Sequence, residues 1–462
     1  MKTLDTSIAV QTPAACPFHS SPFKPSPAFS VIDALNGFVR LGKRTETLSG
    51  SIPVRSVACK PFVDGNKSGL HVWFREPVLL SRDEANPAIQ MTDELFNRVH
   101  RGYEALIGEL IARGLLIENG YWHQRLSAGP VLRRNGVVSV WTGLLVKPAH
   151  GLWLLSTGGY NRRPRVNMRE CAIASSEGYT PLILEFELDS MFKDTMWLEA
   201  ELACLVPVQP GVSFTRSTIR ERPELGVAYN SFYNDSYLET RGGARTVGVY
   251  RKMMAQSESS AESSGARGEA KCELVHIAGP DVHTIETFNH VVGPQGPSTP
   301  ETAAELKFAV LRNFTTLEFD FDGMQSHLNN EDANPFADEL LSTWRELYGE
   351  QTPSPVQWWT MYFIPNLPEM VGEMVQLIVP YAFIKTPPGW STLCDGAHYP
   401  GLDGLRGVIA TDLFHHTPPA YQYRQTGDFR LEYGDPLMRL LPVPRHLLDA
   451  PYEMLELSSM AG

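Results

Sequence analysis

The stretch "LVKPAHGLWLLS" (145–156) recurs near the other end of the chain as "FIKTPPGWSTLC" (383–394), so that Lys147 aligns with Lys385. Three further matches follow in the same order and at similar spacing: "AIAS…YTP" with "VIAT…HTP" (172–181 and 408–418), "WLEAE" with "RLEYG" (197–201 and 430–434), and "CLVPVQP" with "RLLPVPR" (204–210 and 439–445). Chance matches rarely keep both order and spacing. The sequence therefore predicts two similar domains related by internal duplication.

The repeated segments have the composition of β-strands. They are short, rich in β-branched and aromatic residues and bounded by proline or glycine, as in "VVSVWTGLLV", "LILEFEL" and "AYQYR". Many short strands at this spacing indicate antiparallel β-sandwich or jelly-roll-like domains. The predicted fold class is mainly β, of the α+β kind, with one amphipathic helix packed on each domain.

The two predicted helices lie upstream of the repeated strands. Residues 92–114 begin with Thr92 as a candidate N-cap and carry an apolar stripe at helical spacing. Residues 334–349 carry a similar stripe and end at Gly349, a residue type that often terminates helices.

Two low-complexity segments divide the chain. Residues 1–28 are rich in proline and serine and predict a disordered tail. The segment "KMMAQSESSAESSGARGEAK" (252–271) predicts a flexible linker or loop. The predicted domains are therefore 29–251 and 272–462.

The composition is typical of a globular protein from a reducing compartment. Of 462 residues, 43% are hydrophobic and 20% charged, which supports a sizeable core, and the net charge of −12 disfavours nucleic acid as a partner. Six cysteines are spread singly, no apolar run reaches the ~18 residues of a membrane-spanning helix, and no secretory signal is recognisable. We expect a cytoplasmic protein without a membrane partner, and the sequence leaves its oligomeric state open.

Several common enzyme motifs are absent from the sequence. It contains no GxGxxG, GxxxxGK[ST], GxSxG or HExxH pattern. Dinucleotide enzymes, P-loop NTPases, nucleophile-elbow hydrolases and zincins therefore lose support.

The first candidate site surrounds "TDLFHHTPP" (411–419). Two histidines and a carboxylate on a β-scaffold form the ligand set of non-haem Fe(II) enzymes, so His398, Asp412 and His416 are predicted metal ligands. Asp412, His415 and His416 are the predicted catalytic residues, and they would also serve acid–base chemistry without a metal. The alternative is that these histidines are ordinary loop or core residues.

A second candidate is "HIAGPDVHTIETFNH" (276–290). In a helix, His283, Glu286 and His290 would share one face and form a tidy chelate. The β-branched residues of this segment favour a strand instead, in which those side chains separate. The sequence does not decide between this cluster and the first one.

The alternating stretch "LEFDFDG" (317–323) places Glu318, Asp320 and Asp322 on one strand face. Three carboxylates in a row could hold Mg²⁺ or Ca²⁺. A solvated or charged sheet edge explains the same pattern, and we prefer that interpretation.

A basic loop and an aromatic cluster are candidates for substrate binding. Within "NRRPRVNMRE" (161–170), Arg162 and Arg165 could bind an anionic group through their guanidinium forks, or pair with acids of the other domain. Trp358 of "VQWWTMYF" is the predicted aromatic contact for a small-molecule substrate.

The last eighty or so residues resemble an uncharacterised bacterial family of unknown function. The resemblance rests on "TPPGWS" (386–391), "TDLF" (411–414) and "PVPR" (442–445), covers under a fifth of the chain, and implies no activity. The family has Trp where this chain has Leu413, and the histidine pair is not part of its pattern.

Three functional hypotheses remain open on the sequence alone. The first is a small-molecule enzyme, a non-haem Fe(II) oxidoreductase with its site in the second repeat. The second is a metal-free acid–base cyclase or isomerase. The third is a non-catalytic binding or assembly protein.

Overall fold

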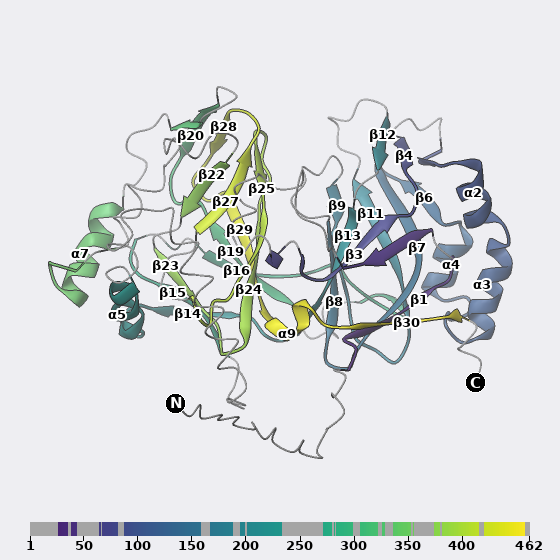
Figure 1. Ribbon diagram of the computed structural model, residues 1–462, viewed down its shortest axis with the longest axis horizontal. Helices are drawn as coiled ribbons and strands as arrows, with labels where there is room; N and C mark the ends of the chain where they lie inside the picture. Colours follow the sequence, from purple (N-terminus) through teal and green to yellow (C-terminus); the bar gives the residue numbers. More distant parts are fainter. Residues whose placement is uncertain are drawn as a thin grey trace, which may run out of the picture.

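A computed structural model describes most of the chain. The described residues are 26–35, 38–43, 64–65, 67–81, 87–158, 167–187, 195–198, 201–232, 271–279, 281, 283–298, 305–321, 326–328, 336–352, 354, 374–378, 381–414 and 420–457. They form two β-rich lobes, with most of the helices at the outer ends and the short helix α9 between the lobes (Figure 1). The mainly β fold predicted from the sequence is confirmed.

The first lobe is built from two large sheets and one small one. The first sheet contains β1 (Phe29–Asp33), β6 (Val131–Arg134), β7 (Val137–Pro148), β9 (Asn167–Arg169), β11 (Thr180–Glu187) and β30 (Tyr452–Leu455). The second contains β2 (Val39–Gly42), β3 (Leu70–Phe74), β8 (Trp153–Gly158), β10 (Cys171–Ile173), β13 (Glu201–Val208), β17 (Val291–Gly293) and β18 (Gly296–Pro297), and the small sheet contains β4 (Val78–Ser81), β5 (Ile89–Gln90) and β12 (Thr195–Leu198). The strand orders are β30-β1-β7-β11-β9 with β6 on β7, β18-β17-β10-β8-β13-β3-β2, and β12-β4-β5.

The described residues of the second lobe form four sheets. Their strands are β14 (Phe214–Thr218), β15 (Cys272–His276) and β23 (Ala382–Lys385); β16 (His283–Thr287), β19 (Lys307–Arg312), β24 (Trp390–Gly396), β26 (Arg406–Ile409) and β29 (Pro436–Pro444); β20 (Leu317–Phe321), β21 (Ser326–Leu328) and β28 (Phe429–Leu431); and β22 (Met374–Ile378), β25 (Leu402–Gly404) and β27 (Ala420–Gln425). The strand orders are β14-β15-β23, β16-β19-β29-β24-β26, β21-β20-β28 and β22-β27-β25.

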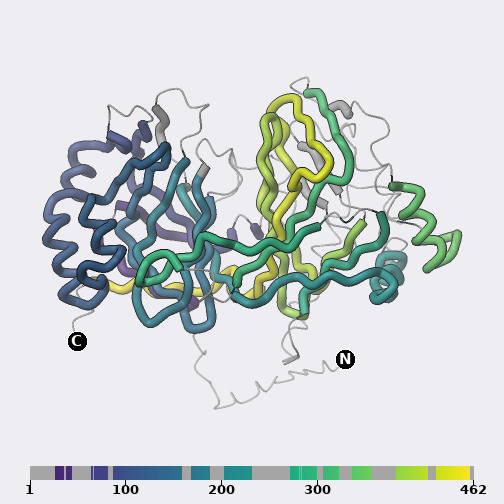
Figure 2. Tube along the Cα trace, turned by 180° about the vertical axis from the view of Figure 1, so that it is seen from behind, coloured from purple at the N-terminus to yellow at the C-terminus, as the bar shows by residue number. Residues whose placement is uncertain are grey.

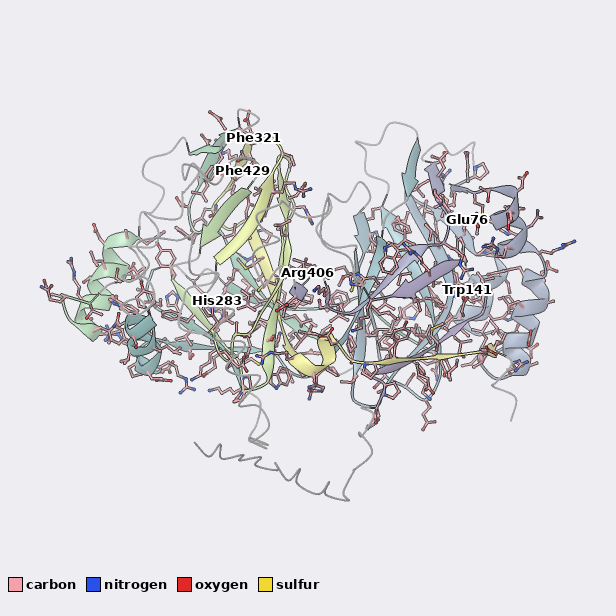
Figure 3. The ribbon with its side chains drawn as sticks, in the orientation of Figure 1. Glu76, Trp141, His283, Phe321, Arg406 and Phe429 are labelled. Atoms are coloured by element: carbon pink, nitrogen blue, oxygen red, sulfur yellow. The ribbon has the colours of Figure 1, made fainter. Side chains whose placement is uncertain are left out.

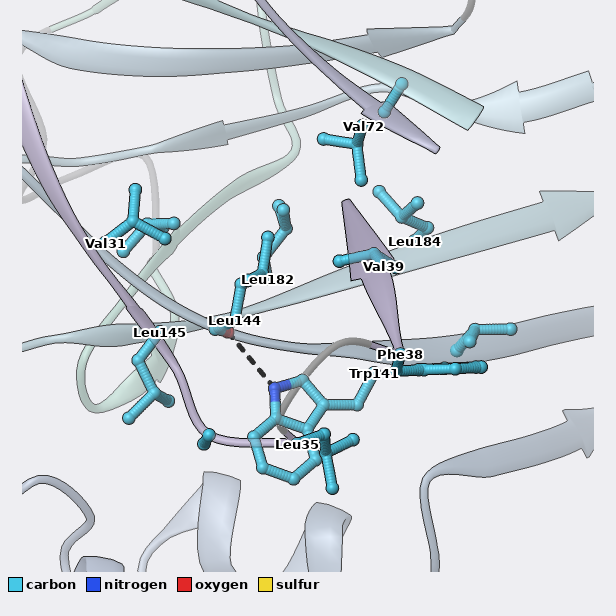
Figure 4. Packing of buried hydrophobic residues seen from close by; sticks show 14 of the residues in the cluster. Val31, Leu35, Phe38, Val39, Val72, Trp141, Leu144, Leu145, Leu182 and Leu184 are labelled. Atoms are coloured by element: carbon cyan, nitrogen blue, oxygen red, sulfur yellow. Dashed lines mark hydrogen bonds between the residues drawn. The ribbon is translucent and has the colours of Figure 1, made fainter. Parts of the chain in front are cut away.

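Each lobe has its own hydrophobic core. In the first lobe, side chains from both large sheets and from the helices pack together around Trp141, which is fully buried. The Trp141 indole N–H donates to the Leu144 carbonyl at 3.2 Å, so burial of the ring leaves no unsatisfied donor (Figure 4). In the second lobe the core gathers around Trp344 and Tyr381. Face-to-face packing of sheets across these cores fits the sandwich prediction.

The helices differ from the prediction of one helix for each domain. Among the described residues they are α2 (Asp93–His100), α3 (Tyr103–Ala112) and α4 (Tyr121–Ser127) on the first lobe, α5 (Pro223–Phe232) and α7 (Ala337–Tyr348) on the second, and the short α9 (Arg445–Leu448). The predicted single helix 92–114 is wrong, because Gly102 has a φ of 78° and divides it into α2 and α3. The cap is confirmed, since the Thr92 hydroxyl accepts the Leu95 N–H at 3.2 Å.

The second predicted helix is confirmed with shorter bounds. α7 ends at Gly349 as expected, and Leu340 and Trp344 of its apolar stripe are fully buried. Its start falls at Ala337.

Strand pairings of the first half recur in the second half with the same register. Leu155 lies opposite Ala172 and Val206, and Leu393 lies opposite Val408 and Leu441, which are the residues that the repeat aligns. Both halves also contain one irregularity at the same place. The pairing of β13 with β3 skips Leu202, and the pairing of β29 with β19 skips Leu437. Leu202 and Leu437 are 235 positions apart, which is also the distance in sequence between the aligned residues Pro207 and Pro442.

The halves exchange their final strands. β14 follows β13 of the first half but pairs in parallel with β15 of the second, and β30 follows β29 of the second half but pairs in parallel with β1 of the first. Figure 1 shows β30 reaching across to the first lobe beside β1. The lobes therefore do not coincide with the predicted domains 29–251 and 272–462, because β14 and α5 belong to the second lobe.

A further segment crosses between the lobes. β17 belongs to the second half but pairs in parallel with β10, so that the first-lobe sheet ends in second-half strands. Figure 2 shows this crossing from behind as the green tube that runs from the second lobe to the first. Nearly all of the predicted linker 252–271 lies outside the described residues, as does nearly all of the predicted tail 1–28.

Candidate functional site

Two of the three residues predicted to bind Fe(II), His398 and Asp412, lie apart in the structure. Asp412 is largely buried, pairs with the Arg445 guanidinium, and accepts the Gly389 N–H at 2.8 Å. His398 is exposed, and its Nδ1 accepts the Gly404 N–H at 3.2 Å. Asp412 is anchored at Gly389, which precedes β24, and His398 follows the same strand. The Asp412 and His398 side chains therefore lie at opposite ends of a strand of seven residues, about 20 Å long.

The other residues of that prediction lie outside the described part of the chain. They are the third ligand His416, the catalytic candidate His415, and the substrate-binding candidates Arg162, Arg165 and Trp358. Among the described residues, no group of three or more His, Cys, Asp or Glu side chains could hold a metal ion.

The carboxylate stripe on β20 behaves as a strand face. Leu317 and Phe319 are buried, while Glu318 is paired with Arg430 of the neighbouring strand β28 and Asp320 is exposed. Asp322 lies outside the described residues. The described contacts agree with the charged-face interpretation of this stretch.

The histidine-rich stretch 276–290 is extended, as its β-branched residues indicated. His276 ends β15 and His283 begins β16, and the strand separates them from Glu286 and His290. The Glu286 carboxylate binds Arg312 at 2.6 Å, whereas His290 donates from Nδ1 to the Glu170 carbonyl at 2.8 Å. The helical chelate does not form.

His276 and His283 nevertheless meet. Their ring centroids are 6.3 Å apart, at the end of β15 and the start of β16. The Asp281 Oδ1 atom lies 3.3 Å from His283 Nδ1 without the geometry of a hydrogen bond. His283 is only 2% exposed, and Figure 3 shows it inside the second lobe.

Two elements distant in sequence complete the cluster. Arg216 on β14, the exchanged strand, donates to Asp281 Oδ2 and to the His283 carbonyl, both at 2.5 Å. Glu339, in the first turn of α7, accepts the Gly279 N–H at 3.3 Å. Arg216 therefore holds Asp281 beside the ring of His283.

Three buried ring nitrogens of this cluster have no hydrogen-bond partner among the described residues. They are Nδ1 of His276 and both Nδ1 and Nε2 of His283. A buried polar atom without a partner costs about 1–3 kcal/mol, so native proteins rarely contain several together without a reason. A polar ligand that forms hydrogen bonds with these nitrogens would explain why they are buried without protein partners.

Burial also sets the protonation of the pair. It lowers the pKa of His283 to about 4 and lowers the pKa of His276 below its usual 6.5, against the opposing effects of Asp281 on both rings and of a hydrogen bond between His276 and the Gly279 backbone. Both rings are therefore neutral at neutral pH, and each neutral imidazole has one nitrogen that can accept a proton and one that can donate.

A second polar group lies at the junction of the lobes, but it is internally satisfied. Asp395 accepts from Arg406 at 2.9 Å and from Arg439 at 2.6 Å, and together these two guanidinium groups hold the pKa of Asp395 well below its usual range. Arg406 also donates to Thr157 Oγ1 at 2.6 Å, and Arg439 pairs with Glu170. These contacts join the lobes.

Comparison with known proteins leaves the family open. No family model matches the chain, and no curated protein matches it. Among solved structures, the 2′-deoxycytidine 5′-triphosphate deaminase from Agrobacterium tumefaciens is similar at 10% identity and a TM-score of 0.22, over 70% of this chain and 76% of that one. A likeness of that size supports no argument about function. Within the described residues, no helix is long and apolar enough to cross a membrane.

The sequence pattern located part of this cluster and missed the rest. His276, Asp281 and His283 stood in one histidine-rich stretch, which is a visible signal. Arg216 and Glu339 stand about sixty positions away on either side, and no local pattern connects them to it.

Proposed function

We propose that the chain is a tandem duplication that carries a metal-free acid–base site in its second half, formed by His276, Asp281 and His283. The recurrence of strand order, register and bulge in the two halves supports the duplication. The observation that supports the site is the set of three buried ring nitrogens without partners beside a carboxylate. A small-molecule cyclase or isomerase is the class of enzyme that this chemistry fits best.

The roles of the residues follow from their burial and contacts. His276 is half-buried and neutral, so it is the ring that a substrate can reach and the candidate general base. Asp281, fixed by Arg216, raises the pKa of both rings and would stabilise the imidazolium that forms when a proton is taken up. The same ring would return the proton to another substrate atom, so the reaction needs no oxidant or reductant.

The Fe(II) oxidoreductase stays a prediction, and the contacts of His398 and Asp412 do not favour it. Asp412 already neutralises Arg445, which makes it a poor candidate for a metal ligand.

Hydrogen exchange on carbon tests the proposed base even while the natural substrate is unidentified. The purified protein is incubated in D₂O with separate panels of hydroxy acids, keto acids, amino acids, sugar phosphates and nucleosides, and deuterium uptake is measured by mass spectrometry. We expect at least one compound to exchange, and His276→Ala to slow that exchange about 100-fold or more. His446→Ala, an exposed histidine on α9 in the same half, is the matched control and should exchange at the wild-type rate.

Two outcomes would count against the site. One is that no compound exchanges above the protein-free rate. The other is that His276→Ala and His446→Ala behave alike.

A further inference from the structure

We infer that the facing surfaces of the two halves recognise each other specifically and reject a second copy of themselves. The halves would then be a matched pair, held together by surface chemistry and not only by the peptide chain. The observations are an apolar contact made from equivalent positions, a charged edge that has diverged between the halves, and the exchanged strands.

The apolar contact joins the outer faces of two equivalent strand sets. β8, β10 and β13 from the first half share a buried cluster with β24, β26 and β29 from the second. Equivalent residues occur on both sides of it: Leu155 and Leu393, Ala172 and Val408, Val206 and Leu441, Val208 and Val443. Aliphatic side chains at matching positions could pair with either half, so this layer supplies affinity without discrimination.

The polar edge of the contact does discriminate. By strand register and repeat alignment, Glu170 occupies the position of Arg406, and Thr157 occupies the position of Asp395. Arg406 of the second half donates to Thr157 of the first at 2.6 Å, while Glu170 of the first half binds Arg439 of the second. The Arg439 guanidinium in turn binds Asp395 at 2.6 Å.

A complex of two first halves or of two second halves would lose the contacts between Arg406 and Thr157 and between Glu170 and Arg439. Cys204 stands in the first half where Arg439 stands in the second, so Glu170 on a pair of first halves would meet Thr157 and Cys204 and no cation. On a pair of second halves, Arg406 would meet Asp395 and Arg439 of the other copy, and no acid would stand in for Glu170, so each copy would bring two guanidinium groups and one carboxylate to a largely buried contact. Unmatched charges at buried contacts are a common way to exclude wrong partners.

The exchanged strands are a second source of specificity between the halves. A first half carries β14, whose pairing strand β15 belongs to the second half, and a second half carries β30, whose pairing strand β1 belongs to the first. Each half therefore completes a sheet of the other.

Cleavage of the folded full-length chain tests this inference. A long protease site is inserted between Ser259 and Ser260, within the serine-rich segment, and the protein is cut after purification. We expect native mass spectrometry to show both fragments in one complex with the mass of the intact chain, about 51.5 kDa plus the insert. Separation of the fragments at 1 µM, or homodimers of either fragment, would overturn the inference.

A matched pair of variants tests the charged edge. Glu170→Gln removes the carboxylate that binds Arg439, and we expect the dissociation constant of the cut fragments to rise at least about 10-fold. Glu187→Gln, whose carboxylate pairs with Arg169 inside the first half, should change it less than about twofold. Equal effects of the two variants would remove the charged edge as the source of specificity.

Discussion

Acidification should destabilise the protein through His283. Its pKa is 6.5 in the unfolded chain and about 4 in the folded protein, so between those values the unfolded chain binds more protons. Stability from this residue is complete above pH 6.5 and is lost as the pH falls toward 4. At about 1.4 kcal/mol for each pH unit, the loss from pH 7 to pH 5 is about 2 kcal/mol.

Comparison with His283→Leu isolates this effect from other titrating groups. Leucine is the residue to introduce because Leu41 occupies the equivalent position in the first half. Leu41 pairs with Val72 on the neighbouring strand, and His283 pairs with Leu311, the counterpart of Val72. The free energy of unfolding in urea is measured for both proteins at pH 7, 6 and 5. The difference between variant and wild type should grow by about 2 kcal/mol in favour of the variant between pH 7 and pH 5.

A difference that stays constant across this range would refute the reasoning, because it would mean that His283 does not change its protonation on unfolding. His446→Leu is the control. It lies exposed on α9, so it controls for the replacement of a histidine by leucine at a position outside the cluster.

Three further changes test the scaffold. Asp412→Asn should lower the free energy of unfolding by about 2 kcal/mol through loss of its ion pair with Arg445, while metal content by mass spectrometry stays below about a tenth of an equivalent of iron for variant and wild type alike. Gly226→Ala should lower the melting temperature in calorimetry, because the added Cβ would lie 2.1 Å from the Tyr348 ring, and overpacking costs about 1–3 kcal/mol. Deletion of residues 451–462 should cost about 2 kcal/mol in urea unfolding, since it removes β30 and its packing on the first lobe.

The β-rich fold was predictable because its signals are local. Alternating and β-branched stretches marked most strands, and the aligned prolines and glycines marked their ends. The strand exchange was not predictable, because β14 and β30 carry no residue that reports which sheet they join. That choice depends on the short connection after β13 and on the packing of the whole second lobe.

The helix error has a similar origin. Residues 92–114 carry a continuous apolar stripe, so periodicity alone indicates one helix. Gly102 permits a left-handed backbone conformation, and Val99 and Tyr103 can then both be buried from two separate helices. Tertiary packing decided between two structures that the local sequence allows.

The cluster around His283 was predictable only in part, because Arg216 and Glu339 come from other elements. The β-branched residues between His283 and Phe288 correctly favoured a strand, and that removed the chelate with Glu286 and His290. The ring of His283 lies 6.3 Å from that of His276, and no local pattern indicated this contact across the connection between β15 and β16. Arg216 enters the site only because β14 is exchanged.

The proposed duplication would separate what the scaffold requires from what the second half adds. The same sheet position holds Leu41 in the first half, where it packs against the core, and His283 in the second, where both ring nitrogens are buried without partners among the described residues. Because the first half shows that an aliphatic side chain fits this position, the fold itself does not call for a histidine there. A buried imidazole that costs stability and satisfies no scaffold need is most simply explained by a role in binding or chemistry, and that is the strongest reason to search for the function at His283 and its neighbours.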